Sequence, residues 1–277
     1  MNNQFKLRNC GEIKYLQCQS KELNQLTNHA FSTRCSGVSK IPYNTLNLSL
    51  SVCDDKKNVI ENRKFFFDVF TIDYKKIVST KQVHKDNIAI ISREDEGKGA
   101  LNYRDSIPGS DALLTNIPGV PLLMFYADCV PVFILDPVKK VIGLIHAGRN
   151  GTLLNLSFKT VVKMEENYGT KPDTCIAAIF PAIGSCCYHF DNQEIVADWL
   201  TDENIKNNIV LKNKENIIQI DLKKANFMQL KKAGLKTRNI FTSNECTADN
   251  LKCYFSHHRD KGKTGRMAAL LMLKENR

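Results

Sequence analysis

The stretch from residue 111 to residue 151 constrains the fold more than any other part of the sequence. It contains three short apolar runs, at 121–127, 131–135 and 141–145, which are rich in β-branched or aromatic residues and bounded by Asp, Pro or Gly. Such runs predict three buried strands. Cys129 lies between the first two of these strands, and His146 follows the third. Rigid strand ends are where enzymes hold functional groups, although a buried thiol and a hydrogen-bonded core histidine fit the same pattern.

Strand and helix patterns alternate irregularly along the rest of the chain. Further strands are predicted within 4–18 and at 29–34, 77–83, 88–91, 174–180, 217–221, 239–242, 253–256 and 267–273, and helices at 59–70, 152–168, 193–200 and 222–232. The polar segment 92–109, which carries three glycines, is expected to be a flexible loop or a lid near the site. Because strict β-α alternation, repeats and linkers are all missing, the sequence predicts an α+β fold, with mixed β-sheets flanked by helices in a single compact domain over residues 1–277.

The composition argues against several classes of protein. No apolar run reaches the length of about 18 residues that a membrane helix needs, and the N-terminus lacks an apolar signal core, so we expect a cytoplasmic protein without a membrane partner. The net charge of +10 comes from scattered lysine pairs without a nucleic-acid-binding motif, so we expect no nucleic-acid partner. The ten cysteines are expected to be reduced, and no C-x-x-C pair indicates a structural zinc ribbon.

A glycine-bearing loop directly after His146 is a candidate phosphate site. The segment Gly148-Arg149-Asn150-Gly151 leads into the helix predicted at 152–168. Free backbone N–H groups and the positive end of the helix dipole favour an anion at such a junction. Many strand–loop–helix junctions look the same, so the segment alone indicates no particular ligand.

Motifs in consistent order along most of the chain point to one family. They read Phe31-Ser-Thr-Arg34, Gly37-Val-Ser, Asn47-Leu-Ser-Leu, Gln82-Val-His84, Asp111-Ala-Leu-Leu-Thr, Ala127-Asp-Cys-Val-Pro-Val, His146-Ala-Gly, Pro181-Ala-Ile-Gly-Ser-Cys-Cys-Tyr188, Arg259-Asp260 and Thr264-Gly-Arg-Met-Ala268. The sequence closely resembles the laccase-domain family, also called multicopper polyphenol oxidase-type proteins, which includes bacterial purine nucleoside phosphorylases. In that family a His, a Cys and a His bind one metal ion, usually zinc, and His84, Cys129 and His146 are the matching positions.

The metal set implied by this resemblance is chemically suited to zinc. Thiolate and imidazole are good zinc ligands, and three protein ligands leave a fourth position open, as in catalytic rather than structural zinc. Copper is the alternative ion. Without the resemblance, these three residues could not be chosen among six histidines and ten cysteines.

The resemblance also implies a reaction. A zinc-dependent purine nucleoside phosphorylase would convert adenosine, inosine and S-methyl-5′-thioadenosine with phosphate to the base and pentose 1-phosphate, and would also deaminate adenosine. Purine nucleosides and phosphate are then the partners of a monomer or small homo-oligomer. Family motifs suggest that Arg34, Asn47 and Cys129 take part in catalysis, with Asn47 hydrogen-bonded to the substrate. The phosphate-binding candidates are Arg34 and the loop residues Gly148, Arg149 and Gly151, and Tyr188 is expected to line the pocket.

Departures from the family pattern leave other functions open. Arg149-Asn150 stands where the family usually has Trp-Arg, and His257-His258-Arg259 stands where Tyr-Arg-Arg is common. One alternative is a copper-dependent, laccase-like polyphenol oxidase, although the chain has no H-x-H pair. Another is a cysteine hydrolase, such as a peptidoglycan-editing amidase, with Cys129 as nucleophile and a histidine as base. A third is a metal-binding protein without catalytic activity.

Overall fold

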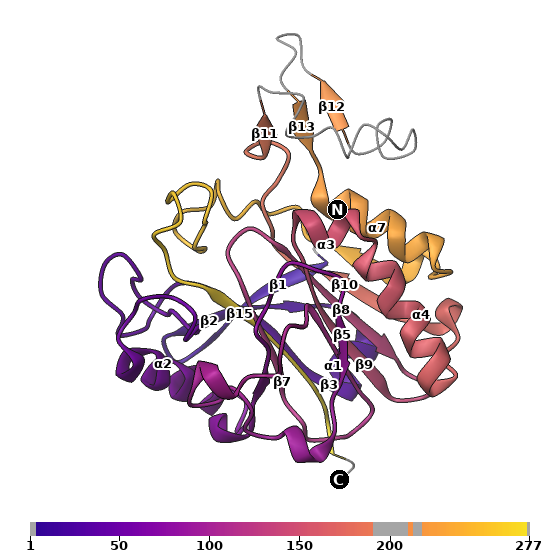
Figure 1. Ribbon diagram of the computed structural model, residues 1–277, viewed down its shortest axis with the longest axis horizontal. Coiled ribbons are helices and arrows are strands. Elements are labelled where there is room, and N and C mark those ends of the chain that lie inside the picture. The colour runs from indigo at the N-terminus through magenta and orange to yellow at the C-terminus, as the bar shows by residue number, and fades with distance from the viewer. Residues whose placement is uncertain (1–3, 191–209, 213–217, 276–277) are drawn as a thin grey trace.

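Two six-stranded mixed sheets form the centre of the structure, a computed structural model that describes residues 4–190, 210–212 and 218–275 (Figure 1). The first sheet has the order β1 (Phe5–Cys10), β2 (Ile13–Cys18), β3 (Thr27–Ser32), β15 (Met267–Leu273), β7 (Leu122–Tyr126) and β4 (Val78–Ser79). The second has the order β14 (Ile240–Thr242), β10 (Ile176–Ile179), β8 (Val130–Asp136), β9 (Val141–Ala147), β6 (Ala112–Thr115) and β5 (Ile88–Ile90). A small sheet of β11 (His189–Phe190), β13 (Ile218–Ile220) and β12 (Val210–Lys212) stands at the top of Figure 1. Mixed sheets with flanking helices confirm the predicted fold class.

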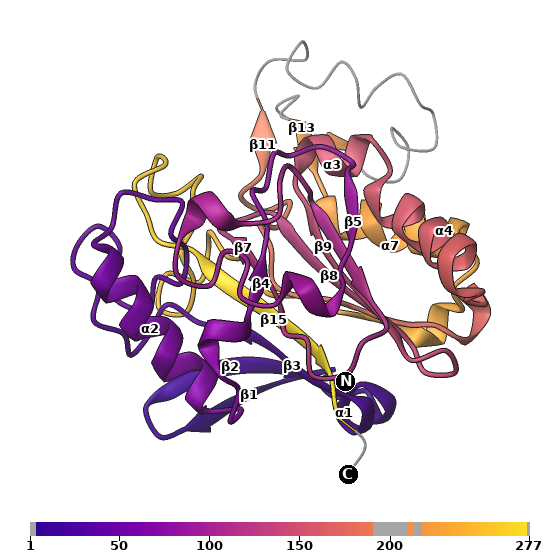
Figure 2. The ribbon, with the colours of Figure 1, turned by 60° about the horizontal axis from the view of Figure 1, so that its bottom comes forward.

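Helices cover the outer faces of the two sheets (Figure 2). The described helices are α1 (Lys21–Leu26), α2 (Lys56–Asp68), α3 (Arg149–Leu153), α4 (Leu156–Tyr168) and α7 (Leu222–Lys232). Apolar residues of α4 and α7 pack on the second sheet, and those of α2 pack on the first. None of the described helices is long and apolar enough to cross a membrane.

The three strands predicted in the central stretch are present as β7, β8 and β9, and every residue in them is buried. Side chains of β8 alternate between two apolar clusters. Phe133 and Leu135 face the first sheet, whereas Val132 and Ile134 face α4 and α7. Burial on both faces explains why these runs are apolar throughout instead of alternating with polar residues.

Helix predictions were confirmed with one correction. The helix predicted at 59–70 is α2, which begins after Asp55, whose carboxylate accepts a hydrogen bond from the Lys57 N–H. The helix predicted at 222–232 is α7. The helix predicted at 152–168 is instead two helices, α3 and α4, because Asn155 between them has a left-handed backbone (φ 59°). Asparagine tolerates this conformation better than most residues. The helix predicted at 193–200 lies outside the described residues.

Three other predictions need correction. The strand predicted at 77–83 is only β4, because the backbone of residues 83–85 turns around the carboxylate of Asp111. Residues 253–256 are not a strand: Cys253 ends a turn, and residues 254–256 have no regular secondary structure. Segment 92–109 contains two short 3₁₀ helices, Arg93–Asp95 and Tyr103–Asp105, and the buried guanidinium of Arg63 donates to the carbonyls of Gly99 and Ala100. These bonds anchor the middle of the segment to α2, and Tyr103 of the segment lies near the site, as expected.

Candidate metal centre

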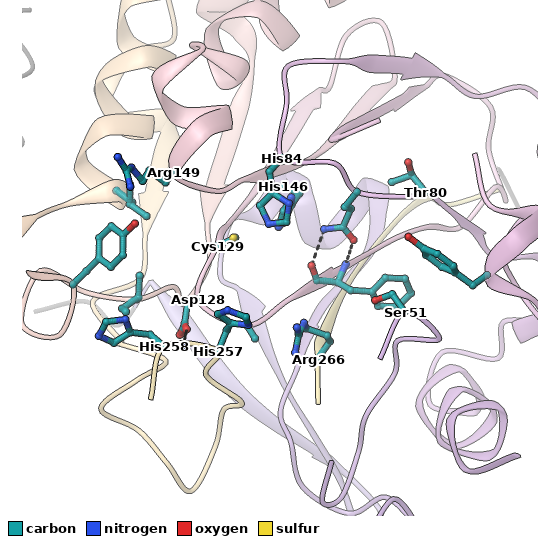
Figure 3. A pocket seen from close by; sticks show the side chains of 17 residues that line it. Ser51, Thr80, His84, Asp128, Cys129, His146, Arg149, His257, His258 and Arg266 are labelled. Atoms are coloured by element: carbon teal, nitrogen blue, oxygen red, sulfur yellow. Dashed lines mark hydrogen bonds between the residues drawn. The ribbon is translucent and has the colours of Figure 1, made fainter. Parts of the chain in front are cut away.

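His84, Cys129 and His146 converge from three different elements at one end of the two sheets. His84 lies in the loop between β4 and β5, Cys129 in the turn between β7 and β8, and His146 within β9. Their ligand atoms all lie within 4.8 Å of one another, and the two imidazole rings meet edge to face with centroids 4.9 Å apart (Figure 3). One ion could therefore contact all three side chains. Two nitrogens and one sulfur are a donor set that suits zinc.

The carboxylate of Asp111 orients both histidines. Its Oδ1 accepts a hydrogen bond from His146 Nδ1 at 2.9 Å and another from the backbone N–H of His84 at 3.1 Å. Its Oδ2 accepts from the backbone N–H groups of Val83 and Lys85 at 3.1 and 2.9 Å. With Nδ1 occupied, Nε2 is the ring nitrogen of His146 that remains for a metal, the arrangement that supports histidine ligands in metal sites.

The role of Asp111 was not predicted from the sequence, where this residue only begins a family motif. The one sequence feature that could have indicated a role is its place, as an acidic residue directly before the apolar residues that form β6. Burial alone would raise the pKa of Asp111, but hydrogen bonds from His146 and from the backbone lower it. The carboxylate therefore stays ionised.

Cys129 and His146 also set each other's protonation. Burial alone would raise the pKa of the Cys129 thiol, but His146 and His84 outweigh it and bring that pKa to about 6. Burial would lower the pKa of His146, but Cys129 and Asp111 raise it to about 9. Without metal at neutral pH, the two groups form a thiolate–imidazolium pair. A bound divalent ion would take the place of the imidazolium proton, as metal binding to histidine generally requires.

Gly148, the N-cap residue of α3, leaves space for the ligands. A Cβ at this position would lie 2.9 Å from Cys129 Sγ and 3.1 Å from His84 Cδ2. The backbone of Gly148 is ordinary (φ −72°), so the close approach, not the conformation, calls for glycine here.

We expect Gly148→Ala to lower the affinity for Zn²⁺ by roughly ten- to a hundredfold, the range seen when groups that support metal ligands are changed. The added methyl group would push apart the sulfur and the imidazole that must share one ion. Competition with a chromophoric chelator on metal-stripped protein measures the effect. Gly151→Ala, three residues further on, is the control. Its methyl group would meet Lys85 O at 3.3 Å and the backbone O of His146 at 3.6 Å, but no metal-ligating atom. Equal affinities for the two variants would contradict this explanation.

A cavity of about 360 Å³ adjoins the three ligands (Figure 3). This volume lies within the usual range for small-molecule sites, about 300–1,000 Å³. Aromatic side chains contribute to the walls, together with cationic and titratable ones: these are Tyr103, Phe125, Tyr188, Arg149, Arg266, His257 and His258. The cavity thus combines flat apolar surface with positive charge.

Asp128 ties the C-terminal part of the chain to the centre. Its carboxylate accepts hydrogen bonds from Thr247 Oγ1 at 2.7 Å, Ser256 Oγ at 2.9 Å and the His258 N–H at 2.7 Å. Since Asp128 directly precedes Cys129, these bonds place His257 and His258 beside the three candidate ligands. These two histidines depart from the family pattern, and their place at the site was not predicted from the sequence.

Arg34 and Asn47 are not brought to the cavity, contrary to the sequence-based expectation. The Nε and Nη2 of Arg34 donate to Asn44 O at 3.0 and 2.8 Å, and its guanidinium lies over the Phe255 ring at 4.7 Å. Asn47 has no exposed surface and accepts a hydrogen bond from the backbone N–H of Arg266 at 3.0 Å. Both residues shape loops around the site, and neither lines it.

The other predicted binding residues have mixed outcomes. Arg149 and Tyr188 line the cavity, whereas Gly148 packs on the metal ligands and Gly151 is buried within α3. The predicted phosphate loop is itself the first turn of α3, a helix of only five residues, so the helix-dipole argument is weak there. Arg266, which sequence reasoning quoted only inside a motif, is a second cation in the wall.

Comparisons with known proteins show which family this chain is similar to. A family model described as "Multi-copper polyphenol oxidoreductase laccase" matches residues 28–274. The purine nucleoside phosphorylase YlmD of Bacillus subtilis is 34% identical over 265 residues, which cover 93% of this chain and 92% of that protein. The crystal structure of YlmD from Geobacillus stearothermophilus superposes with a TM-score of 0.91 at 31% identity, covering 98% of this chain and 99% of that one. The Bacillus licheniformis hypothetical protein YfiH superposes with a TM-score of 0.90 at 34% identity, covering 98% and 100%.

Proposed function

The chain belongs to the laccase-domain family, and on this premise we propose that it is a zinc-dependent purine nucleoside phosphorylase. One observation carries the proposal: His84, Cys129 and His146 converge beside a cavity with aromatic and cationic walls. Relatives that match nearly the whole chain bear the name purine nucleoside phosphorylase. The proposed substrates are adenosine, inosine and S-methyl-5′-thioadenosine, together with phosphate.

The side chains that line the cavity can stabilise the charges that phosphorolysis involves. A phosphate oxygen forms a bond to C1′ while the bond from C1′ to the purine breaks, and the purine leaves with that electron pair and takes up a proton. Arg266 and Arg149 would offset the phosphate charge. Burial raises the pKa of Tyr188 to about 12, so its hydroxyl keeps its proton and can donate a hydrogen bond to the substrate. A bound zinc ion would supply a Lewis acid and lower the pKa of a water molecule to about 7.

The proposal includes a second reaction, the deamination of adenosine to inosine. This reaction replaces the amino group on C6 with an oxygen from water and releases ammonia. It requires no phosphate, so the two activities separate in a simple experiment. The same cavity would bind the purine for both reactions.

The test is to incubate purified, zinc-loaded protein with each nucleoside, with and without phosphate, and to separate the products by chromatography. Free base and pentose 1-phosphate should form only when phosphate is present. Inosine should form from adenosine under both conditions. If none of the nucleosides is consumed by fully loaded protein, the proposed function is wrong.

A copper-dependent polyphenol oxidase, the activity for which the family is named, has less support. A His₂Cys copper site for electron transfer normally has a weak axial ligand such as methionine. None of the residues that line the described cavity is a methionine. Nor do the described residues contain a cluster of histidines beyond His84 and His146 that could hold several copper ions.

A cysteine hydrolase is favoured by one specific observation. The thiol of Cys129 contacts the imidazole of His146, which contacts the carboxylate of Asp111. Enzymes with an activated nucleophile have the same arrangement of nucleophile, base and orienting carboxylate. The same three groups also suit a metal ligand pair and its supporting carboxylate. The reactivity of the thiol distinguishes the two functions.

We expect iodoacetamide to alkylate Cys129 only in metal-stripped protein. The pKa of its thiol is lowered to about 6, so the thiolate predominates above that pH and the alkylation rate should fall as the pH drops through about 6. Mass spectrometry of the labelled peptide measures this rate. In zinc-loaded protein the sulfur should be protected at any pH at which the zinc stays bound. Rapid labelling of Cys129 in protein that retains its zinc would favour the hydrolase.

A further inference from the structure

Three cysteines outside the main cavity form a second group of soft ligands. Cys186 and Cys187 lie in the loop between β10 and β11, and Cys246 lies in the loop after β14. Their Sγ atoms all lie within 4.8 Å of one another, and those of Cys186 and Cys187 are 3.7 Å apart. Two thiolates on one tetrahedral zinc ion, each bonded at about 2.3 Å, are about 3.8 Å apart. The spacing of these sulfurs therefore suits a shared ion.

The backbone holds the two loops together at this point. Ala182 and Cys246 form an isolated parallel bridge, and the Gly184 N–H donates to Cys246 Sγ at 3.1 Å. A Cβ at Gly184 would lie 3.1 Å from Cys186 Sγ and 3.5 Å from Cys246 Sγ. The missing side chain at Gly184 thus leaves the space in which these sulfurs approach each other.

Access and charge at this cluster also suit a cation bound by thiolates. Cys186 is exposed and, with Cys246, lines a separate cavity of about 380 Å³. The same cavity is lined by Lys223, a buried residue whose Nζ donates to the carbonyls of Ser243 and Glu245 at 2.9 and 2.8 Å. Three thiolates and one divalent ion carry a net charge of −1, which a neighbouring ammonium group offsets. A monovalent ion would leave −2, so the charge balance favours a divalent ion.

We propose that Cys186, Cys187 and Cys246 bind a second thiophilic divalent ion, such as zinc, separate from the main centre. The ion would join the loop at 181–188 to the loop at 243–248. Ile183 and Tyr188 of the first loop line the main cavity, and Thr247 of the second holds Asp128. The second ion would therefore hold together two loops that shape the main cavity.

Metal content tests the second site independently of any catalytic activity. Reduced, metal-stripped wild-type protein reloaded with Zn²⁺ and desalted should retain about two ions per chain, one for each ligand set. Cys246→Ser and Cys186→Ser should each retain about one, and Cys129→Ala should also retain about one. Cys253→Ser is the matched control, a partly buried thiol outside the cluster that should leave the content unchanged. Cys186 is exposed, so its substitution should not prevent folding.

Cobalt(II) provides a second readout, because thiolate–cobalt bonds absorb in the near ultraviolet. Cys129→Ala protein loaded with Co²⁺ should keep strong absorption, contributed by three thiolates at the second site. That absorption should disappear when Cys246→Ser is added. If Cys129→Ala retains no ion, or if Cys246→Ser and Cys186→Ser both retain as many ions as wild type, there is no second site. A disulfide among these cysteines that persists under reducing conditions would also overturn the proposal. None of these outcomes depends on nucleoside turnover.

Discussion

Replacing Cys129 with alanine is expected to lower nucleoside phosphorolysis by at least about a thousandfold, equivalent to about 4 kcal/mol of transition-state stabilisation. The substitution removes the one anionic ligand of the three that converge on the proposed ion. Loss of a Lewis acid typically costs several kcal/mol, which accounts for an effect of this size. Steady-state assays with inosine and phosphate, together with elemental analysis of the same preparation, measure it.

Cys129 is a better position for this test than His146. Alanine at His146 would leave the buried carboxylate of Asp111 without its imidazole partner, and an unpaired buried charge destabilises the fold. Cys129 is only partly buried, and its loss should leave the thermal unfolding temperature nearly unchanged. His84→Ala, at an exposed ligand, should reproduce the loss of activity. If Cys129→Ala loses activity but still holds the wild-type amount of zinc, the sulfur acts as a nucleophile and not as a ligand.

Arg266→Gln is expected to weaken the apparent affinity for phosphate by roughly ten- to a hundredfold. Charge-assisted hydrogen bonds contribute about 1.5–3 kcal/mol, which corresponds to that range. Arg266 lines the cavity, and its guanidinium is positioned by bonds from Nη1 to Thr264 O and Gly265 O. Burial lowers the pKa of this arginine, but nearby Cys129 and Asp128 favour its charged form. The KM for phosphate, measured at saturating inosine, is the readout, and adenosine deamination should change far less because it uses no phosphate.

Arg34→Gln is the matched control for this experiment, because it makes the same change of charge outside the cavity. Arg34 is committed to Asn44 O and to the ring of Phe255, so its loss should lower the unfolding temperature and leave the KM for phosphate unchanged. A larger rise in that KM for Arg34→Gln than for Arg266→Gln would reverse the assignment. The phosphate would then bind outside the cavity that Figure 3 shows.

Many elements of this fold could be predicted from local patterns because those patterns report burial and backbone conformation. The continuous apolar runs predict β7, β8 and β9, since strands buried on both faces have no polar side. Helical spacing predicts α2 and α7 for a related reason: one face of each packs on a sheet. Position along the family motifs also identified His84, Cys129 and His146 as a set, and their side chains do converge.

Interactions between distant segments could not be predicted in this way. Asp111 orients His146 across 35 positions of sequence and fixes the backbone of His84 across 27, and nothing local to Asp111 records either partner. The family motifs predict Arg34 at the phosphate and indicate no role for Arg266. In the structure Arg34 is directed toward Asn44, and Arg266 lines the cavity. Residue type and spacing describe what a side chain can do, but its direction depends on strand register and on the loops packed around it. In this protein, local sequence patterns determine the strands, the helices and the types of functional side chain that are present. The packing of the two sheets, and of the C-terminal loop on Asp128, determines which of those side chains share one site.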